Sequence, residues 1–213
     1  MKLSLALATA ALATAVYAAP AHSGDQLNCT TGSTHALKWM KGWGKDKPHG
    51  FFTFDAEKDE QGRPVATALN KDGSAAKPVK FHFQSCAAPK GKPGYMGYGT
   101  GEHANGAREG HFQLVSDPSQ CLTVTSTKGQ HIRLVLDKCQ YSDSKVQETQ
   151  FFGLGVNAIS SGIRPRADDM ENNNYKYRMS NKGAQPMIIA NTGKDVQDEQ
   201  EAYLYLSLIH ISE

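Results

Sequence analysis

Apolar and polar residues alternate in short runs along most of the chain, and turn-forming residues separate the runs. An alternation with a period of two predicts a β-strand that buries one face. Such runs occupy residues 51–54, 65–69, 79–84, 95–98, 111–115, 121–124, 132–136, 151–154, 175–179, 187–190 and 202–205. Turn clusters such as 70–73 and 116–119 lie between them, and no amphipathic helix is evident. We therefore expect an all-β fold with about eleven or twelve short strands, arranged as a barrel or a sandwich.

The composition agrees with a turn-rich domain that has one core. Of the 213 residues, 39% are hydrophobic and 21% are charged, with 20 glycines and 9 prolines. These proportions exclude collagen-like, coiled-coil and wholly disordered chains. The formal net charge of +2 indicates no basic face for nucleic acid. No apolar run after the leader reaches the roughly 18 residues of a membrane span. We expect neither a nucleic-acid nor a membrane partner, and no cofactor.

The first residues have the pattern of a secretory signal peptide. Met1 and Lys2 form a short charged region, an apolar stretch follows, and small residues end it. Ala18 completes a small-x-small cleavage site, and Pro20 disfavours cleavage one residue later. We expect residues 1–18 to be removed, which leaves residues 19–205 as a single secreted, extracellular domain.

The last eight residues, 206–213, match the translation of a transposase sequencing adapter. The alternative is a genuine β-rich tail, because residues 204–206 have a strand pattern. We expect an adapter-derived artefact, with the natural protein continuing differently after Tyr205.

Four cysteines follow the leader, at Cys29, Cys86, Cys121 and Cys139. An even number in an oxidising compartment favours disulfides. No two are close enough for the CxxC pair of a zinc site, so we expect no metal. Cys121 and Cys139 flank a compact segment with two apolar runs, so we expect them to pair, which leaves Cys29 for Cys86.

The middle of the chain contains a set of motifs in a definite order. A C-L-x-V motif at 121–124 is followed by an apolar run that ends in Cys139, and a Q-x-F motif closes the segment at 150–152. This segment resembles one lobe of the ricin B-type β-trefoil lectins, in their fungal secreted form. The resemblance implies a β-trefoil-like fold with its clearest lobe at 111–154, and Phe152 as a core anchor where three lobes meet. It also implies a third lobe that is truncated before its final strand.

Sugar binding is the activity that this resemblance implies. Lobes of the family carry an Asp directly after the C-L pair, where its carboxylate accepts hydrogen bonds from sugar hydroxyls. Here Thr123 holds that position, and one neutral hydroxyl cannot replace a carboxylate. Asp137 and Gln140 flank Cys139 as candidate polar contacts, and Tyr141 is a candidate stacking platform. The alternative is that these three residues belong to ordinary turns and loops.

Two tryptophans and several lysines are further candidates. Trp39 and Trp43 lie among lysines, where exposed rings can stack on glycans; the alternative is that they cover the open end of a barrel. The remaining basic residues are interpreted as a solvated loop rather than a binding patch: Lys77, Lys80, Lys90 and Lys92.

A catalytic interpretation requires converging acid and base groups. Histidines and carboxylates that could form a ribonuclease-like pair are His82, His103, His111, His131, Glu102, Glu109 and Asp137, with Arg108 as the nearby cation. Solvent-exposed loop histidines are the simpler interpretation, and the sequence has no G-x-S-x-G, HExxH or P-loop motif. We therefore do not expect an enzyme.

The expected function is that of a secreted, non-catalytic protein that binds a glycan or a cell-wall polysaccharide. The main alternative is a secreted interaction or effector protein on the same scaffold, with a protein partner and no sugar site. A small secreted hydrolase or ribonuclease is the third hypothesis.

Overall fold

The structure is a computed structural model that describes residues 26–41, 49–87, 108–128, 132–157, 160–165, 176–180, 186–189 and 199–208. Within these residues the fold is all-β, which confirms the predicted fold class. The strands are β1 (Asn28–Lys41), β2 (His49–Phe51), β3 (Thr53–Lys58), β4 (Pro64–Thr67), β5 (Lys80–Ala87), β6 (Arg108–Leu114), β7 (Gln120–Val124), β8 (Ile132–Lys138), β9 (Phe152–Asn157), β10 (Ser160–Pro165), β11 (Lys176–Ser180), β12 (Pro186–Ile189) and β13 (Glu199–Leu208). A single turn of helix, α1 (Gln147–Gln150), precedes β9. Among these residues, no helix has the length and apolar character needed to cross a membrane.

Most of the predicted runs lie on strands. The run at 95–98 lies outside the described residues, and every other run coincides with one of the strands. The pattern missed β1 and β10, whose sequences are rich in Thr, Ser and Gly and carry few alternating apolar residues. β1 is held mainly by β5 and β13, which are distant in the sequence, whereas β10 pairs along its length with the preceding strand β9.

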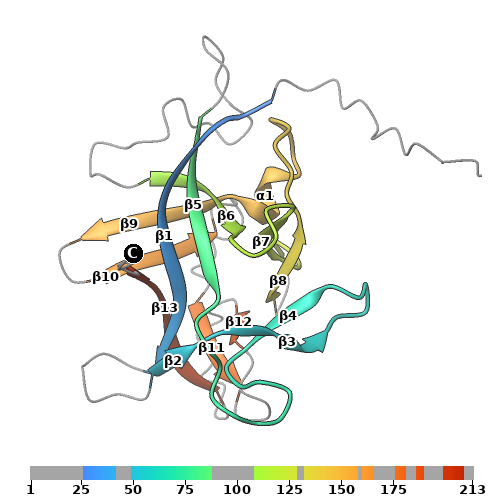
Figure 1. Cartoon of the computed structure of the whole chain (residues 1–213), viewed down its shortest axis with the longest axis vertical. Coiled ribbons are helices and arrows are strands. Elements are labelled where there is room, and N and C mark those ends of the chain that lie inside the picture. Colours follow the sequence, from blue (N-terminus) through green and yellow to red (C-terminus); the bar gives the residue numbers. More distant parts are fainter. Residues whose placement is uncertain are drawn as a thin grey trace, which may run out of the picture.

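Six strands pair in a closed cycle (Figure 1). Antiparallel pairs join β1 to β5, β5 to β6, β6 to β9, β9 to β10 and β10 to β13, and β13 pairs with β1. Six of the other strands form hairpins between these six: β3 with β4, β7 with β8, and β11 with β12. The remaining strand, β2, pairs with β1. The hairpins also touch each other, through the β4–β8 and β8–β12 pairs. The sheet is therefore strongly curled, with its first and last strands side by side.

The hydrophobic core lies inside this curled sheet. Phe81 and Phe83 on β5 alternate with polar residues, and they face Leu114 and Phe112 across the β5–β6 pair. Leucines, valines and alanines from the β3–β4 and β7–β8 hairpins complete the cluster. Phe152 is fully buried, and its ring packs edge-on against Phe112 with centroids 5.7 Å apart. The prediction that Phe152 is a core residue is confirmed.

Both predicted disulfides are present. Cys29 on β1 lies directly opposite Cys86 on β5 and is bonded to it. Cys121 begins the β7–β8 hairpin and Cys139 follows its end, and these two are also bonded. Among the described residues there is no free cysteine. Each bridge ties neighbouring strands together and restricts the unfolded chain.

The last strand contains the predicted run at 202–205 and is longer than that run. Residues 199–208 form β13, which pairs with β1, β10 and β11. Residues 206–208, the start of the segment matched to an adapter, lie opposite 35–37 of β1 in this pairing. Their backbone groups are therefore part of the β1–β13 ladder.

Candidate functional site

A polar layer covers the outer face of β5 and β6. On these strands the residues that alternate with the core phenylalanines are Gln84, Cys86, Glu109, His111 and Gln113, and we call this set the outer polar layer. Four of the five are buried, and Gln113 is partly buried. The segment 140–151, which contains α1, contacts this layer from outside through hydrogen bonds and ring contacts.

His111 is the centre of the outer polar layer. Its side chain is fully buried, and Nε2 lies 2.6 Å from Oε1 of Gln147. The Gln147 amide nitrogen donates to the carbonyls of Gln140 and Ser142, which fixes its oxygen as the acceptor, so Nε2 of His111 carries the proton. Burial lowers the pKa of His111 to about 4, against a smaller opposing effect of Gln147. The ring is therefore neutral near pH 7.

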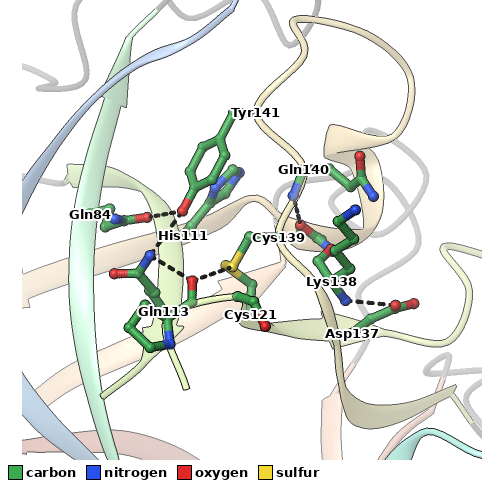
Figure 2. Close-up of a disulfide and its surroundings, with 12 residues drawn as sticks. Gln84, His111, Gln113, Cys121, Asp137, Lys138, Cys139, Gln140 and Tyr141 are labelled. Atoms are coloured by element: carbon green, nitrogen blue, oxygen red, sulfur yellow. Dashed lines mark hydrogen bonds between the residues drawn. A yellow bond between two sulfur atoms is a disulfide. The ribbon is translucent and has the colours of Figure 1, made fainter. Parts of the chain in front are cut away.

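Tyr141, the predicted stacking platform, contacts side chains of the outer polar layer (Figure 2). Its hydroxyl donates to Oε1 of Gln84 at 2.8 Å and accepts from Nε2 of Gln113 at 3.2 Å. Its ring lies 5.2 Å from that of His111, centroid to centroid. Burial raises the pKa of Tyr141, so the phenol stays protonated. The ring is half-buried and covers part of the outer polar layer at His111.

The other predicted contacts of the middle segment also serve internal bonds. Thr123 is 2% exposed, and its hydroxyl donates to the carbonyl of Cys121. Asp137 forms an ion pair with Arg63 at 3.1 Å, which crosses from β8 to the loop before β4. The backbone amide of Gln140 donates to Oε1 of Gln150. Gln140 and Tyr141 are neighbours in the chain. Thr123 bonds within β7, and Asp137 contacts Arg63, so the structure does not gather these residues into one site.

Trp39 lies on β1 and is partly buried against the core. Its indole nitrogen donates to the carbonyl of Phe51 at 3.2 Å. The indole also lies against Gly50 so closely that a Cβ there would meet it at 2.9 Å. Trp39 therefore packs against core residues at the β1–β2 pair. Trp43 lies outside the described residues.

A polar depression of about 420 Å³ opens beside the β3–β4 hairpin. It is lined by Thr53, Asp55, Asn70, Lys71, Asp72 and Lys77. Its volume is within the range of small-ligand sites, although it is more open and more polar than most. Two elements build it: the start of β3 and the turn that follows β4. The hydrogen bonds of Asn70 to Ser74 and Ala75 hold that turn closed.

The depression offers both hydrogen-bond acceptors and donors. Oδ1 of Asp55 accepts from the Thr53 hydroxyl at 2.7 Å, and Oδ1 of Asp72 accepts from the amide and hydroxyl of Ser74. The two Ser74 bonds hold the pKa of Asp72 below its ordinary value, so this carboxylate is ionised. Each carboxylate has a second oxygen that can accept from a ligand. Lys71 and Lys77 are exposed and, in the described part of the chain, neither forms an ion pair. The depression therefore presents two carboxyl groups and two lysine side chains.

Sequence reasoning did not find this depression. Residues 70–73 were interpreted as turn chemistry and Lys77 as part of a solvated loop, and both descriptions are correct locally. The missing information is spatial, because the β3–β4 pairing is what brings Asp55 next to the turn.

Two residues of the ribonuclease-like hypothesis are buried in the structure. His111 and Glu109 are at most 1% exposed. Nδ1 of His82 lies 3.0 Å from the Thr34 hydroxyl, on the β1–β5 pair. His103, His131 and Glu102 lie outside the described residues, as does the side chain of Arg108. Among the candidates that the structure describes, the buried His111 and the partly buried His82 therefore form no surface acid–base pair through these hydrogen bonds.

Comparisons with known proteins give no relative: the chain matches no protein-family model, no curated protein and no solved structure.

Proposed function

We propose that this chain is a secreted, non-catalytic carbohydrate-binding protein on a β-trefoil-like scaffold, similar to the ricin B-type lectins. The polar depression at Asp55 and Asp72 is its sugar site. The ligand is a glycan or a cell-wall polysaccharide.

The strand pairing supports the trefoil part of the proposal. In a trefoil, three four-strand units each give two strands to a six-stranded barrel and one hairpin to its end. Here the cycle of six strands is interrupted by three hairpins, one between β1 and β5, one between β6 and β9, and one between β10 and β13. The additional pairs between hairpins fit a three-fold cap. Phe152 packs at the interior of the cycle, as the family pattern requires.

The make-up of the depression is the observation that supports sugar binding most directly. Sugars are bound through pairs of vicinal hydroxyls, each of which both donates and accepts. Asp55 and Asp72 supply side-chain oxygen acceptors, and Asn70, Lys71 and Lys77 supply polar or cationic groups beside them. Charge-assisted bonds of this kind are the strongest that a hydroxyl makes with a protein.

Two further observations fit the proposal. The burial of His111 and Glu109 supports a binding role over acid–base catalysis, because a buried neutral imidazole does not exchange protons with a substrate in solvent. Two disulfides are consistent with an extracellular protein, and with the signal peptide expected at 1–18.

The second candidate function is protein binding without a sugar site. It is favoured by one observation: in the middle unit, Thr123 is buried and Asp137 is paired with Arg63, so neither is free to serve the family's usual sugar contacts.

A pair of matched variants tests the proposal. Asp72 and Asp117 are both exposed and make the same turn, each accepting from the amide and hydroxyl of the serine two residues later. Only Asp72 lines the depression. The full secreted chain, Asp72→Asn and Asp117→Asn are compared for retention on immobilised β-glucan, chitin, galactan and mannan.

We expect the chain to bind one of these matrices, and Asp72→Asn to weaken that binding by about tenfold or more, as loss of a charged acceptor does. Asp117→Asn is expected to bind like the unmodified chain. Equal binding by both variants would remove the sugar site from this depression. If no polysaccharide retains the folded chain, protein binding becomes the leading function.

A further inference from the structure

Three residues with metal-binding atoms meet at the outer polar layer, and two of them, Cys86 and His111, belong to it. The sulfurs of Cys29 and Cys86 and a ring nitrogen of His111 all lie within 4.8 Å of one another. They come from three adjacent strands, β1, β5 and β6, in the middle of a continuous antiparallel sheet. In the described part of the chain, this is the one group of three such residues.

The hydrogen bonding of His111 leaves one ring nitrogen available. Nε2 donates to Gln147, so Nδ1 is the unprotonated nitrogen, and it has no hydrogen-bond partner. A buried acceptor without a partner is costly and calls for an explanation. A histidine whose one N–H is held by an amide or carbonyl oxygen, with the other nitrogen free, has the arrangement usual in metal-ligating histidines.

We propose that Cys29, Cys86 and His111 form a binding site for a soft metal ion, Cu⁺, when the disulfide between the two cysteines is reduced. A dithiol reductant supplies two electrons and two protons. The sulfur–sulfur bond breaks, two thiols form, and the reductant becomes a cyclic disulfide. Cu⁺ then displaces both thiol protons to solvent, and it is held by two thiolates and Nδ1 of His111.

The chemistry of the three ligands selects the metal. Thiolates favour Cu⁺ and Zn²⁺ among the common ions, and Zn²⁺ generally takes four ligands in protein sites. The group identified contains three, which suits the trigonal coordination that Cu⁺ accepts. Metal–ligand bonds of about 2.0–2.3 Å require the ring nitrogen to approach the metal position, while the two sulfurs move apart once their bond is broken. Cys29 is half-buried, and it gives reductant and metal a route to the site.

The second disulfide provides an internal control. Cys121 and Cys139 also form a reducible pair on adjacent strands, but no described histidine or carboxylate completes a group of three with them. The variant C121S/C139S keeps only the proposed site, and C29S/C86S keeps only the control pair. Both are made in the full chain, reduced anaerobically with a dithiol, freed of reductant, and titrated with Cu⁺ against a chromophoric Cu⁺ chelator.

We expect C121S/C139S to bind one Cu⁺ at least tenfold more tightly than C29S/C86S does. In the C121S/C139S background, His111→Gln keeps a donor for Gln147 but removes the ring nitrogen, and it should weaken Cu⁺ binding by tenfold or more. X-ray absorption should detect one nitrogen and two sulfur neighbours. Equal affinities of the two cysteine variants would overturn the proposal, and so would an unchanged affinity in His111→Gln. Near-UV circular dichroism is recorded throughout, and a reduced protein that is unfolded with and without Cu⁺ would overturn it as well.

Discussion

Nε2 of His111 on β6 lies 2.6 Å from Oε1 of Gln147 on α1, and both residues are fully buried. This bond fastens the one helical turn of the described chain to the outside of the sheet. Gln147 and Gln150, three residues apart on α1, both point inward and satisfy backbone groups of the segment that follows β8. This helical turn places two side-chain amides in the interior, and four residues are enough to do so.

Stability should fall as the pH is lowered from about 6.5 to about 4. Burial lowers the pKa of His111 to about 4 in the folded chain, whereas the unfolded value is near 6.5. Between these values the unfolded state binds the proton and the folded state does not, so acid favours unfolding. The full effect is on the order of 3 kcal/mol below the lower pKa. Urea unfolding at pH 7 and pH 4.5 measures it. His111→Gln should show a smaller loss over the same interval; an equal loss would assign the effect to other groups, such as the buried His35.

Gln150→Ala should destabilise the fold by about 2–4 kcal/mol. The side chain is 2% exposed, accepts from the amide of Gln140 and donates to the carbonyl of Lys138, so its removal leaves two backbone groups without partners. Chemical denaturation checks the value. Gln61→Ala is the control, because that side chain is exposed, and it should change the stability by less than about 0.5 kcal/mol. Similar effects of the two substitutions would contradict this role for Gln150.

Gly110→Ala should be among the most damaging single substitutions. A Cβ at Gly110 would lie 1.7 Å from the carbonyl oxygen of Gln84, which is backbone of the adjacent strand and cannot rotate away. The β5–β6 pair has to separate, at an expected cost of more than about 3 kcal/mol. Gly62 provides the contrast: its φ is +78° but nothing lies within 4 Å, so Gly62→Ala should cost only about 1 kcal/mol. Thermal unfolding of the two variants should rank them in that order.

Phe152→Ala should cost about 3–5 kcal/mol, because the ring is fully buried and leaves a cavity beside Phe112. Leu69→Ala is the control, since Leu69 is 42% exposed. A double-substitution cycle with Phe112→Leu should give a coupling energy above about 0.5 kcal/mol, as expected for side chains in contact. An additive result would mean that the two rings do not pack as described.

The sequence predicted those parts of the fold that local pattern controls. The runs at 81–83 and 112–114 alternate because one face of each strand meets the core, and they were identified correctly. Strand β1 was missed because Asn28–Ser33 contains no large apolar residue; this strand is specified by its partners and by the bond of Cys29 to Cys86. The pairing of the cysteines was predictable, because the hairpin between Cys121 and Cys139 is itself local.

The candidate site was harder to predict than the fold. Tyr141 was selected as a surface group, but Gln84, more than fifty residues away in the sequence, accepts a hydrogen bond from its hydroxyl. Asp55 and Asp72 both line the depression. In the sequence alone, however, the first has the pattern of a strand residue and the second that of a turn residue. Single-residue chemistry indicates which groups can bind, and only the strand pairing decides which of them face solvent.

The pairing of β1 with β13 also has a consequence for biosynthesis. On a ribosome, β1 is made early, and the segment that lies along His35–Lys41 is not available until residues 202–208 have been translated. Until then one edge of β1 has unpaired backbone groups, which can join to a strand of another nascent chain. Contacts between such distant residues also slow folding. The β1–β13 pair can therefore form only after most of the chain has been made, which makes it a late contact in folding.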